Sequence, residues 1–144
     1  MRLTVSLLLW LIVGSAQPPQ EAPATVYVYR PAESHSVRGH DLTILCDGQP
    51  LARLPYGRFF AAKIAPGEHF ISDKRTRYHV KVKVESGGEY YVKAEWWMGT
   101  LTTKRVFSWV APEQGRDDVK LLKPIDPGHI TDHARVAVPG SDRR

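Results

Sequence analysis

The sequence has 144 residues, of which 42% are hydrophobic and 24% charged, with a formal net charge of +5 and one cysteine. Its length is that of one domain. The single cysteine, Cys46, excludes an internal disulfide and a zinc site built on several thiolates. The densest basic cluster spans only residues 74–77, far short of the basic stripe of a nucleic-acid-binding protein, so we expect no nucleic-acid partner.

Residues 1–16 have the three parts of a signal peptide. Arg2 supplies the positive start, residues 3–13 are mainly apolar, and residues 14–16 are the small side chains that a signal peptidase reads. The apolar run is shorter than the roughly 20 residues of a membrane-spanning helix. We therefore expect cleavage before Gln17 and a mature chain in the periplasm or outside the cell, without stable membrane insertion. An uncleaved tether is the alternative.

A proline-rich linker at residues 17–24 is followed by turn residues that interrupt apolar or alternating runs about every 8–12 residues. This spacing is typical of short strands in a sandwich or barrel. The predicted strands are Thr25–Arg30, Asp41–Cys46, Gln49–Leu54, Arg58–Ile64, Glu68–Ser72, Tyr78–Glu85, Glu89–Trp97 and Lys104–Val110. We expect residues 25–123 to form an all-β domain, a small antiparallel β-sandwich of about seven to nine strands, immunoglobulin-like or transthyretin-like.

Two pairs of turn residues predict hairpins. Asp47-Gly48 is a type I′ sequence between two predicted strands. Gly87-Gly88 separates two strongly alternating runs, residues 78–85 and 89–97, and predicts an antiparallel hairpin with one buried and one solvated face.

The C-terminal part of the sequence is less regular. Residues 112–122 are compatible with a short helix, and residues 119–123 are equally compatible with a last strand. From Pro124 onward, Pro, Gly, Asp, Arg and His dominate, and we expect residues 124–144 to be a disordered tail.

No group of residues has the spacing of a known catalytic motif, and we assign no catalytic residue, metal or cofactor. His129 and His133 have the spacing of two ligands on one helical face, but they follow Pro127-Gly128 and no third ligand is placed, so we expect a solvated tail. Cys46 ends an apolar run and is expected in the core.

Aromatic residues gather on two adjacent predicted strands, residues 89–97 and 104–110. Most are expected in the core, but strict alternation cannot bury both Trp96 and Trp97. We hypothesise that Trp97, with Tyr91 on the same face, forms an exposed aromatic patch that binds an envelope protein or glycan.

Five short motifs occur in order along the chain. They are Val26-Tyr27-Val28-Tyr29-Arg30-Pro31, Asp47-Gly48, Leu54-Pro55-Tyr56-Gly57-Arg58-Phe59-Phe60, Pro66-Gly67-Glu68-His69 and Gly88-Glu89-Tyr90-Tyr91-Val92. Together they resemble the motifs of the bacterial family called domain of unknown function 2846, over about residues 25–123, and the turn at Pro66-Gly67 followed by His69 is also similar to PEGA-type envelope sandwiches. The resemblance implies an exported or lipid-anchored β-sandwich without an established activity. This sequence lacks the lipoprotein cysteine of many members.

Arg30, Gly57, Pro66, Gly67, His69 and Tyr91 match the family pattern. We interpret Arg30 and His69 as structural hydrogen-bonding groups. The function we predict is a non-enzymatic binding or interaction module of the cell envelope. One alternative is an enzyme, or an accessory domain to one, that acts on envelope glycans; it would need a cleft that holds His35, His40 or His69 beside a carboxylate. The other alternative is a metal-handling protein that uses the histidines.

Overall fold

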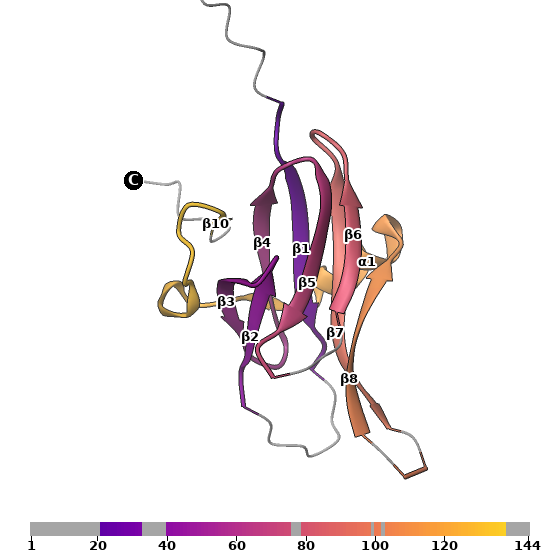
Figure 1. Ribbon diagram of the computed structural model, residues 1–144. Helices are drawn as coiled ribbons and strands as arrows, with labels where there is room; N and C mark the ends of the chain where they lie inside the picture. Colours follow the sequence, from indigo (N-terminus) through magenta and orange to yellow (C-terminus); the bar gives the residue numbers. More distant parts are fainter. Residues whose placement is uncertain (1–20, 33–39, 76–78, 99, 102, 138–144) are drawn as a thin grey trace, which may run out of the picture.

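The computed structural model describes residues 21–32, 40–75, 79–98, 100–101 and 103–137, and the side chains at 96–98 and 103–105 are not part of that description. The predicted signal peptide and most of the linker lie outside the described residues. Two β-sheets pack face to face, with one helix on the outside of the larger sheet (Figure 1). The chain is therefore an all-β sandwich, as the sequence predicts.

Eight strands of five to ten residues make up most of the described part of the chain, and each lies within one residue of its predicted bounds. They are β1 (Ala24–Arg30), β2 (Leu42–Cys46), β3 (Gln49–Leu54), β4 (Arg58–Ile64), β5 (Gly67–Asp73), β6 (His79–Val84), β7 (Glu89–Met98) and β8 (Thr103–Val110). They are followed by the helix α1 (Pro112–Lys120), the short strand β9 (Lys123–Pro124), the 3₁₀ turn η1 (Pro127–His129) and the short strand β10 (Val136–Ala137).

The larger sheet has the order β10-β4-β1-β7-β8, with β9 also paired to β4, and the smaller has the order β3-β2-β5-β6. Neighbouring strands are antiparallel, except that β1 runs parallel to β7 and β4 runs parallel to β9. Alternate residues of β1, Val26 and Val28 among them, point into the core between the sheets. The β2–β3 hairpin has Asp47 and Gly48 at φ +52° and +80°, which confirms the predicted type I′ turn.

The hairpin predicted between β6 and β7 is wrong. β6 pairs with β5 in the smaller sheet, whereas β7 pairs with β1 and β8 in the larger one, so the Gly87-Gly88 turn crosses from one sheet to the other. Val82 and Val84 of β6 and Val92 of β7 are all buried in the one core between the sheets. Alternation is the same for strands that are hydrogen-bonded neighbours and for strands that face each other across a core, so the pattern does not separate the two.

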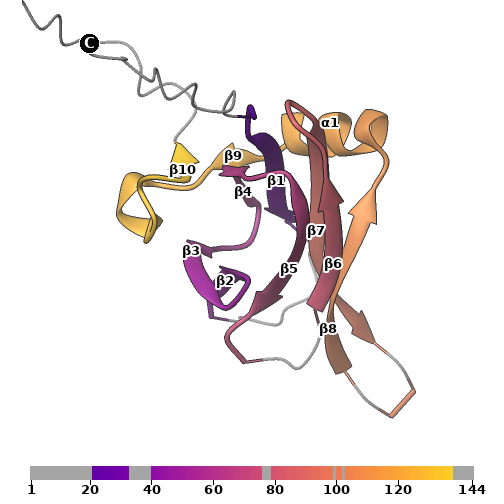
Figure 2. The same ribbon diagram turned by 45° about the horizontal axis from the view of Figure 1, so that its top comes forward.

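Helix α1 covers the outer face of the larger sheet (Figure 2). Between the two alternatives for this segment, the structure has the helix, followed only by the two-residue strand β9. Tyr29, Phe59 and Tyr91 are buried beneath it, with Val119 and Leu122 packed against them. In the described part of the chain, no helix is long and apolar enough to cross a membrane.

The prediction of a disordered tail from Pro124 is wrong for residues 124–137. Ile125 and Val136 are buried in the main core, and Ile130 packs against it. β10 pairs with the edge of β4, and Asp132 binds Arg135 across a turn at 2.6 Å. These apolar residues are isolated within a polar segment and follow no helical or strand period, so neither periodicity nor composition predicts that they are buried. Residues 138–144 lie outside the described residues.

Candidate functional site

Cys46, Asp47 and His69 meet at one corner of the smaller sheet. The β2–β5 pairing brings them together, because Cys46 is the register partner of Ile71, two residues beyond His69. Asp47 Oδ2 lies 2.6 Å from His69 Nδ1 and 3.8 Å from Cys46 Sγ. Asp47 Oδ1 accepts a hydrogen bond from the backbone N–H of Phe70 at 2.8 Å, which fixes the carboxylate against β5.

The order of these three groups is not that of a cysteine nucleophile with its base. In such a triad the imidazole lies next to the sulfur, whereas here the carboxylate of Asp47 lies between Cys46 and His69. Burial, reinforced by the Asp47 charge, raises the pKa of the Cys46 thiol to about 11. Burial opposes ionisation of Asp47 too, but hydrogen bonds from His69 and Phe70 outweigh it and lower the pKa of that carboxyl. The thiol is buried, as predicted, and protonated near neutral pH.

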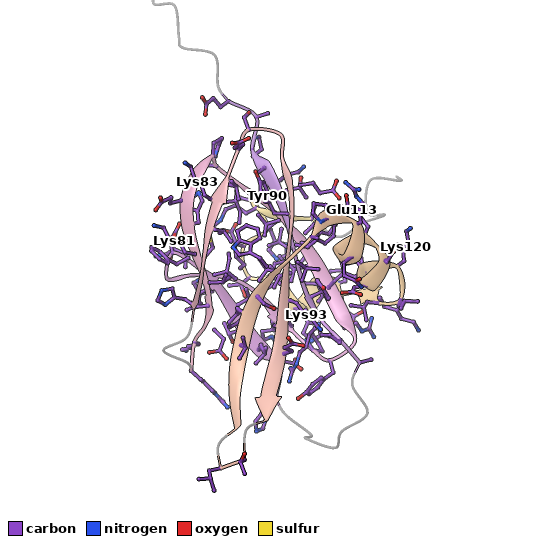
Figure 3. The ribbon with its side chains drawn as sticks, turned by 90° about the vertical axis from the view of Figure 1, so that its right-hand side faces the viewer. Lys81, Lys83, Tyr90, Lys93, Glu113 and Lys120 are labelled. Carbon is purple, nitrogen blue, oxygen red and sulfur yellow. The ribbon has the colours of Figure 1, made fainter. Side chains whose placement is uncertain are left out.

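A pocket of about 290 Å³ lies between the C-terminal end of α1 and the end of β1. Figure 3 shows Lys93 below α1, with Glu113 and Lys120 at the two ends of the helix. Leu121, at the rim, is 87% exposed. The residues that line the pocket are Tyr29, Pro31, Ala32, Lys93, Asp118, Leu121 and Leu122.

The polar side chains that line this pocket have partners within the fold. The Tyr29 hydroxyl donates to Asp118 Oδ2 at 2.5 Å, and the Gln114 amide donates to the other oxygen of that carboxylate at 2.7 Å. Lys93 Nζ lies 2.8 Å from Glu95 Oε2. Burial raises the pKa of Tyr29, and the hydrogen bond to Asp118 adds to the shift. The polar wall is thereby held in place and leaves the apolar residues as the contact surface.

A second, more polar pocket of about 440 Å³ is lined by Asp41, Thr43, Asp73, Lys74 and Arg75. His129 lies near it, with Nε2 at 3.4 Å from Asp41 Oδ2. His133, the other member of the predicted helical pair, is exposed beyond η1. Among the described histidines, His69 lies closest to a carboxylate, with Nδ1 2.6 Å from Asp47 Oδ2, and His35 lies outside the described residues.

Of the two residues predicted to bind a partner, Tyr91 is only 3% exposed, so the prediction that it is solvent-facing is wrong. Its ring stacks on Tyr27 with 4.8 Å between centroids, and it donates a hydrogen bond to Glu89. Alternation placed Tyr91 on the outer face correctly, but α1 covers that face. The side chain of Trp97 lies outside the described residues.

Two exposed aromatic side chains, Phe70 and Trp109, lie outside the predicted patch. Phe70 makes an edge contact with His79 on the outer face of the smaller sheet. Trp109 is partly exposed, and its indole N–H donates to the Lys81 carbonyl, which ties β8 to the edge of β6. Figure 3 shows Tyr90 between these two strands; its ring makes an edge contact with Trp109.

The family model for DUF2846, described as a protein of unknown function, matches residues 20–107. The chain belongs to this family. The DUF2846 match ends within β8, so α1, β9 and β10 follow the matched segment. No curated protein matches the chain, and no solved structure matches it.

Two residues that match the DUF2846 pattern have the structural roles predicted for them. Arg30 is buried at the end of β1 and donates to the carbonyls of His40 and Leu54, with its guanidinium 3.3 Å from the centre of the Tyr56 ring. His69 contacts the Ala65 carbonyl through Nε2 at 2.6 Å and so holds the turn before β5.

Proposed function

We propose that this protein is an exported, non-enzymatic interaction module of the cell envelope, and that it binds a partner protein at the pocket beside the end of α1. Export is supported by the three-part leader at residues 1–16. The observation that carries the binding site is the apolar rim of the pocket, where Leu121 is almost fully exposed next to Leu122.

The size and lining of the pocket favour a side chain of another protein as its occupant. Its volume is at the lower limit of the roughly 300–1,000 Å³ of small-molecule sites. The lining includes the apolar residues Pro31, Ala32, Leu121 and Leu122, and an apolar side chain placed in the pocket reduces their contact with water. Each fully buried aliphatic side chain is worth about 1.5–3 kcal/mol, enough for an anchor contact.

A glycan is the less favoured ligand. Sugar-binding surfaces use exposed aromatic rings as platforms. Tyr91, half of the predicted platform, is covered by α1, and Tyr29, the aromatic residue that lines the pocket, is fully buried. A non-enzymatic role is favoured because the carboxylate in the pocket, Asp118, has both oxygens bonded within the fold. The Cys46 thiol is protonated, and the group next to it is the weakly basic carboxylate of Asp47 rather than an imidazole.

The test is affinity capture from an envelope extract of the native host, with the crosslinked mature chain as bait. Leu121→Asp removes the apolar rim, and Leu101→Asp is the matched control because Leu101 is 94% exposed in the β7–β8 connection. The proposal predicts one discrete protein that the wild type and Leu101→Asp retain and Leu121→Asp loses. Equal capture by all three chains, or loss only with Leu101→Asp, contradicts it.

Export is tested separately by the mass of the chain purified from the native host. Cleavage after Ala16 gives a mature chain that begins at Gln17 and is recovered outside the cytoplasm. A chain that retains residues 1–16 and is recovered with the cytoplasm contradicts this part of the proposal.

A further inference from the structure

Three side chains, each with a different kind of metal-ligating atom, lie together at the β2–β3 turn. The imidazole of His69, the carboxylate of Asp47 and the thiol of Cys46 each present one ligand atom, and these atoms lie within 4.8 Å of one another. Asp47 is the first of the two central residues of the type I′ turn, and its backbone N–H donates to the Phe70 carbonyl at 2.9 Å. Backbone hydrogen bonds between adjacent strands therefore hold the three ligating side chains close together in the absence of a metal ion.

The His69 ring is oriented in a way that is compatible with metal binding. Nε2 lies 2.6 Å from the carbonyl oxygen of Ala65, which can only accept, so Nε2 carries the hydrogen. In the neutral ring, Nδ1 then presents its lone pair to Asp47 Oδ2, also an acceptor, at 2.6 Å. Two acceptor atoms at this distance need a cation between them, which is a proton or a metal ion. Metal-binding histidines characteristically donate their outer N–H to a carbonyl or carboxylate, as His69 does.

The sulfur of Cys46 completes a set that suits a borderline-soft ion. Mg²⁺ and Ca²⁺ take oxygen ligands, whereas Zn²⁺ accepts nitrogen, oxygen and sulfur together. Bonds of about 2.0–2.3 Å to a shared ion separate tetrahedral ligand atoms by roughly 3.3–3.8 Å. The Cys46–Asp47 separation of 3.8 Å already meets this requirement, and the His69–Asp47 pair must open by less than about 1 Å.

The charges around the cluster also suit a divalent ion. Asp47 and an ionised Cys46 supply two negative charges, which balance those of Zn²⁺. Arg135 lies near the Cys46 sulfur. The Arg135 guanidinium is itself paired with Asp132 at 2.6 Å, so the two together add no net charge.

We propose that Cys46, Asp47 and His69 form a three-ligand Zn²⁺ site at the β2–β3 turn, with its open position on the solvent side of Asp47. The side chain of Asp47 is 44% exposed, which gives the ion a route in, whereas Cys46 is fully buried beneath it. Three protein ligands and one open position is the arrangement of zinc sites that exchange a fourth ligand. This site lies on the smaller sheet and does not depend on the pocket beside α1.

The test uses the full chain, reduced and freed of metal by a chelator. Calorimetric titration with Zn²⁺ is expected to give one equivalent per chain, and Co²⁺ in its place is expected to give the charge-transfer absorption of a thiolate ligand. His69→Gln and Cys46→Ala are each expected to weaken binding by more than about tenfold. His133→Gln, an exposed histidine outside the cluster, is the matched control and is expected to bind as the wild type does.

Zn²⁺ is also expected to protect Cys46 of the wild type from a thiol reagent, and the chelator to reverse that protection. This measurement and the cobalt spectrum need no variant, so they decide the question even if Cys46→Ala fails to fold. Absence of binding, a cobalt complex without thiolate absorption, or equal binding by His69→Gln overturns the proposal and leaves a proton between His69 and Asp47.

Discussion

Tyr29 and Tyr91 lie on the outer face of the larger sheet, and the hydroxyl of each donates a hydrogen bond to a carboxylate. Tyr29 donates to Asp118 of α1, and Tyr91 to Glu89 of its own strand. Burial is the main cause that raises the pKa of both tyrosines, and the neighbouring carboxylates add to it. The folded chain therefore retains these two protons at a pH at which the unfolded chain loses them.

Stability is therefore expected to fall as the pH rises above about 10, the ordinary tyrosine pKa. Below that pH both states hold the protons; above it the unfolded state binds fewer than the folded state, so ionisation favours unfolding. Tyr29→Phe is expected to cost about 1 kcal/mol at neutral pH, the net value of a hydrogen bond, and to make the alkaline decline shallower. Denaturant unfolding measured from pH 8 to 12 checks both, and an equally steep alkaline decline in the variant contradicts the assignment.

At the residue scale, the local environments of Cys46, Asp47 and His69 were predictable from the sequence, but their proximity in the fold was not. Asp47 was predicted in a turn, Cys46 in the core and His69 as a structural donor, each from local pattern. Their convergence depends on the β2–β5 pairing, which joins segments more than 20 residues apart, as the 22-residue separation of Asp47 and His69 shows. No local period carries that information, because strand order is decided by packing across the whole sandwich.

Helix α1 approaches the sheet closely because Gly115 faces Tyr91. A Cβ at position 115 would lie 2.2 Å from Tyr91 Cγ and 2.5 Å from its Cβ, atoms near the backbone that cannot swing away. The small residue therefore allows the helix to cover Tyr29 and Tyr91, and so to form one wall of the pocket beside it.

Gly115→Ala is expected to lower stability, although alanine is the better helix former by about 1 kcal/mol. The clash with Tyr91 forces the helix outward and costs about 1–3 kcal/mol beyond that gain. Gly128→Ala is the matched control, because nothing lies within 4 Å of its added Cβ. Urea unfolding of the two variants is the measurement; a Gly115→Ala chain as stable as the control would show that α1 does not dock as described.

At the scale of elements, strand positions were predictable and strand partners were only partly so. The eight main strands follow from alternation and turn residues, and the β2–β3 hairpin follows from Asp47-Gly48, since both signals are local. The Gly87-Gly88 turn was predicted to join a hairpin but connects the two sheets. A glycine at φ +71° is compatible with both kinds of connection, so the sequence does not distinguish them. β6 cannot pair with β7, because β1 and β8 occupy the two sides of β7.

Over the whole molecule, the residues after the DUF2846 match complete the fold. α1 covers the outer face of the larger sheet, while Ile125 and Val136 extend the main core at its β4 edge. Composition alone marked residues 124–137 as a tail, and only the packing of these isolated apolar side chains shows that they belong to the domain.

A chain that ends at Pro124 is therefore expected to be less stable than the full chain by several kcal/mol, at about 1.5–3 kcal/mol for each buried aliphatic side chain removed. A chain that ends at Ala137 retains every buried residue described here and is expected to unfold with the full chain. Thermal unfolding of the three proteins checks this. Equal melting temperatures for all three proteins would show that residues 125–137 do not contribute to stability, as expected of a disordered tail.

The two proposed sites lie in different layers, the Cys46 cluster in the smaller sheet and the pocket on the outer face of the larger one. His69→Gln is therefore expected to capture the partner as well as the wild type does, while its Zn²⁺ binding is weakened by more than about tenfold. A partner that is lost with His69→Gln would show that the two sites are coupled.

Photocrosslinking in intact cells of the native host tests whether a partner protein docks at the pocket beside α1. A photoreactive amino acid replaces Leu121 at the pocket rim in one chain and Leu101 in the β7–β8 connection in another, two positions of similar exposure. We expect one discrete adduct, recovered in the envelope fraction, at position 121 and none at position 101. An adduct only at position 101, or no adduct at position 121, would contradict docking at the pocket.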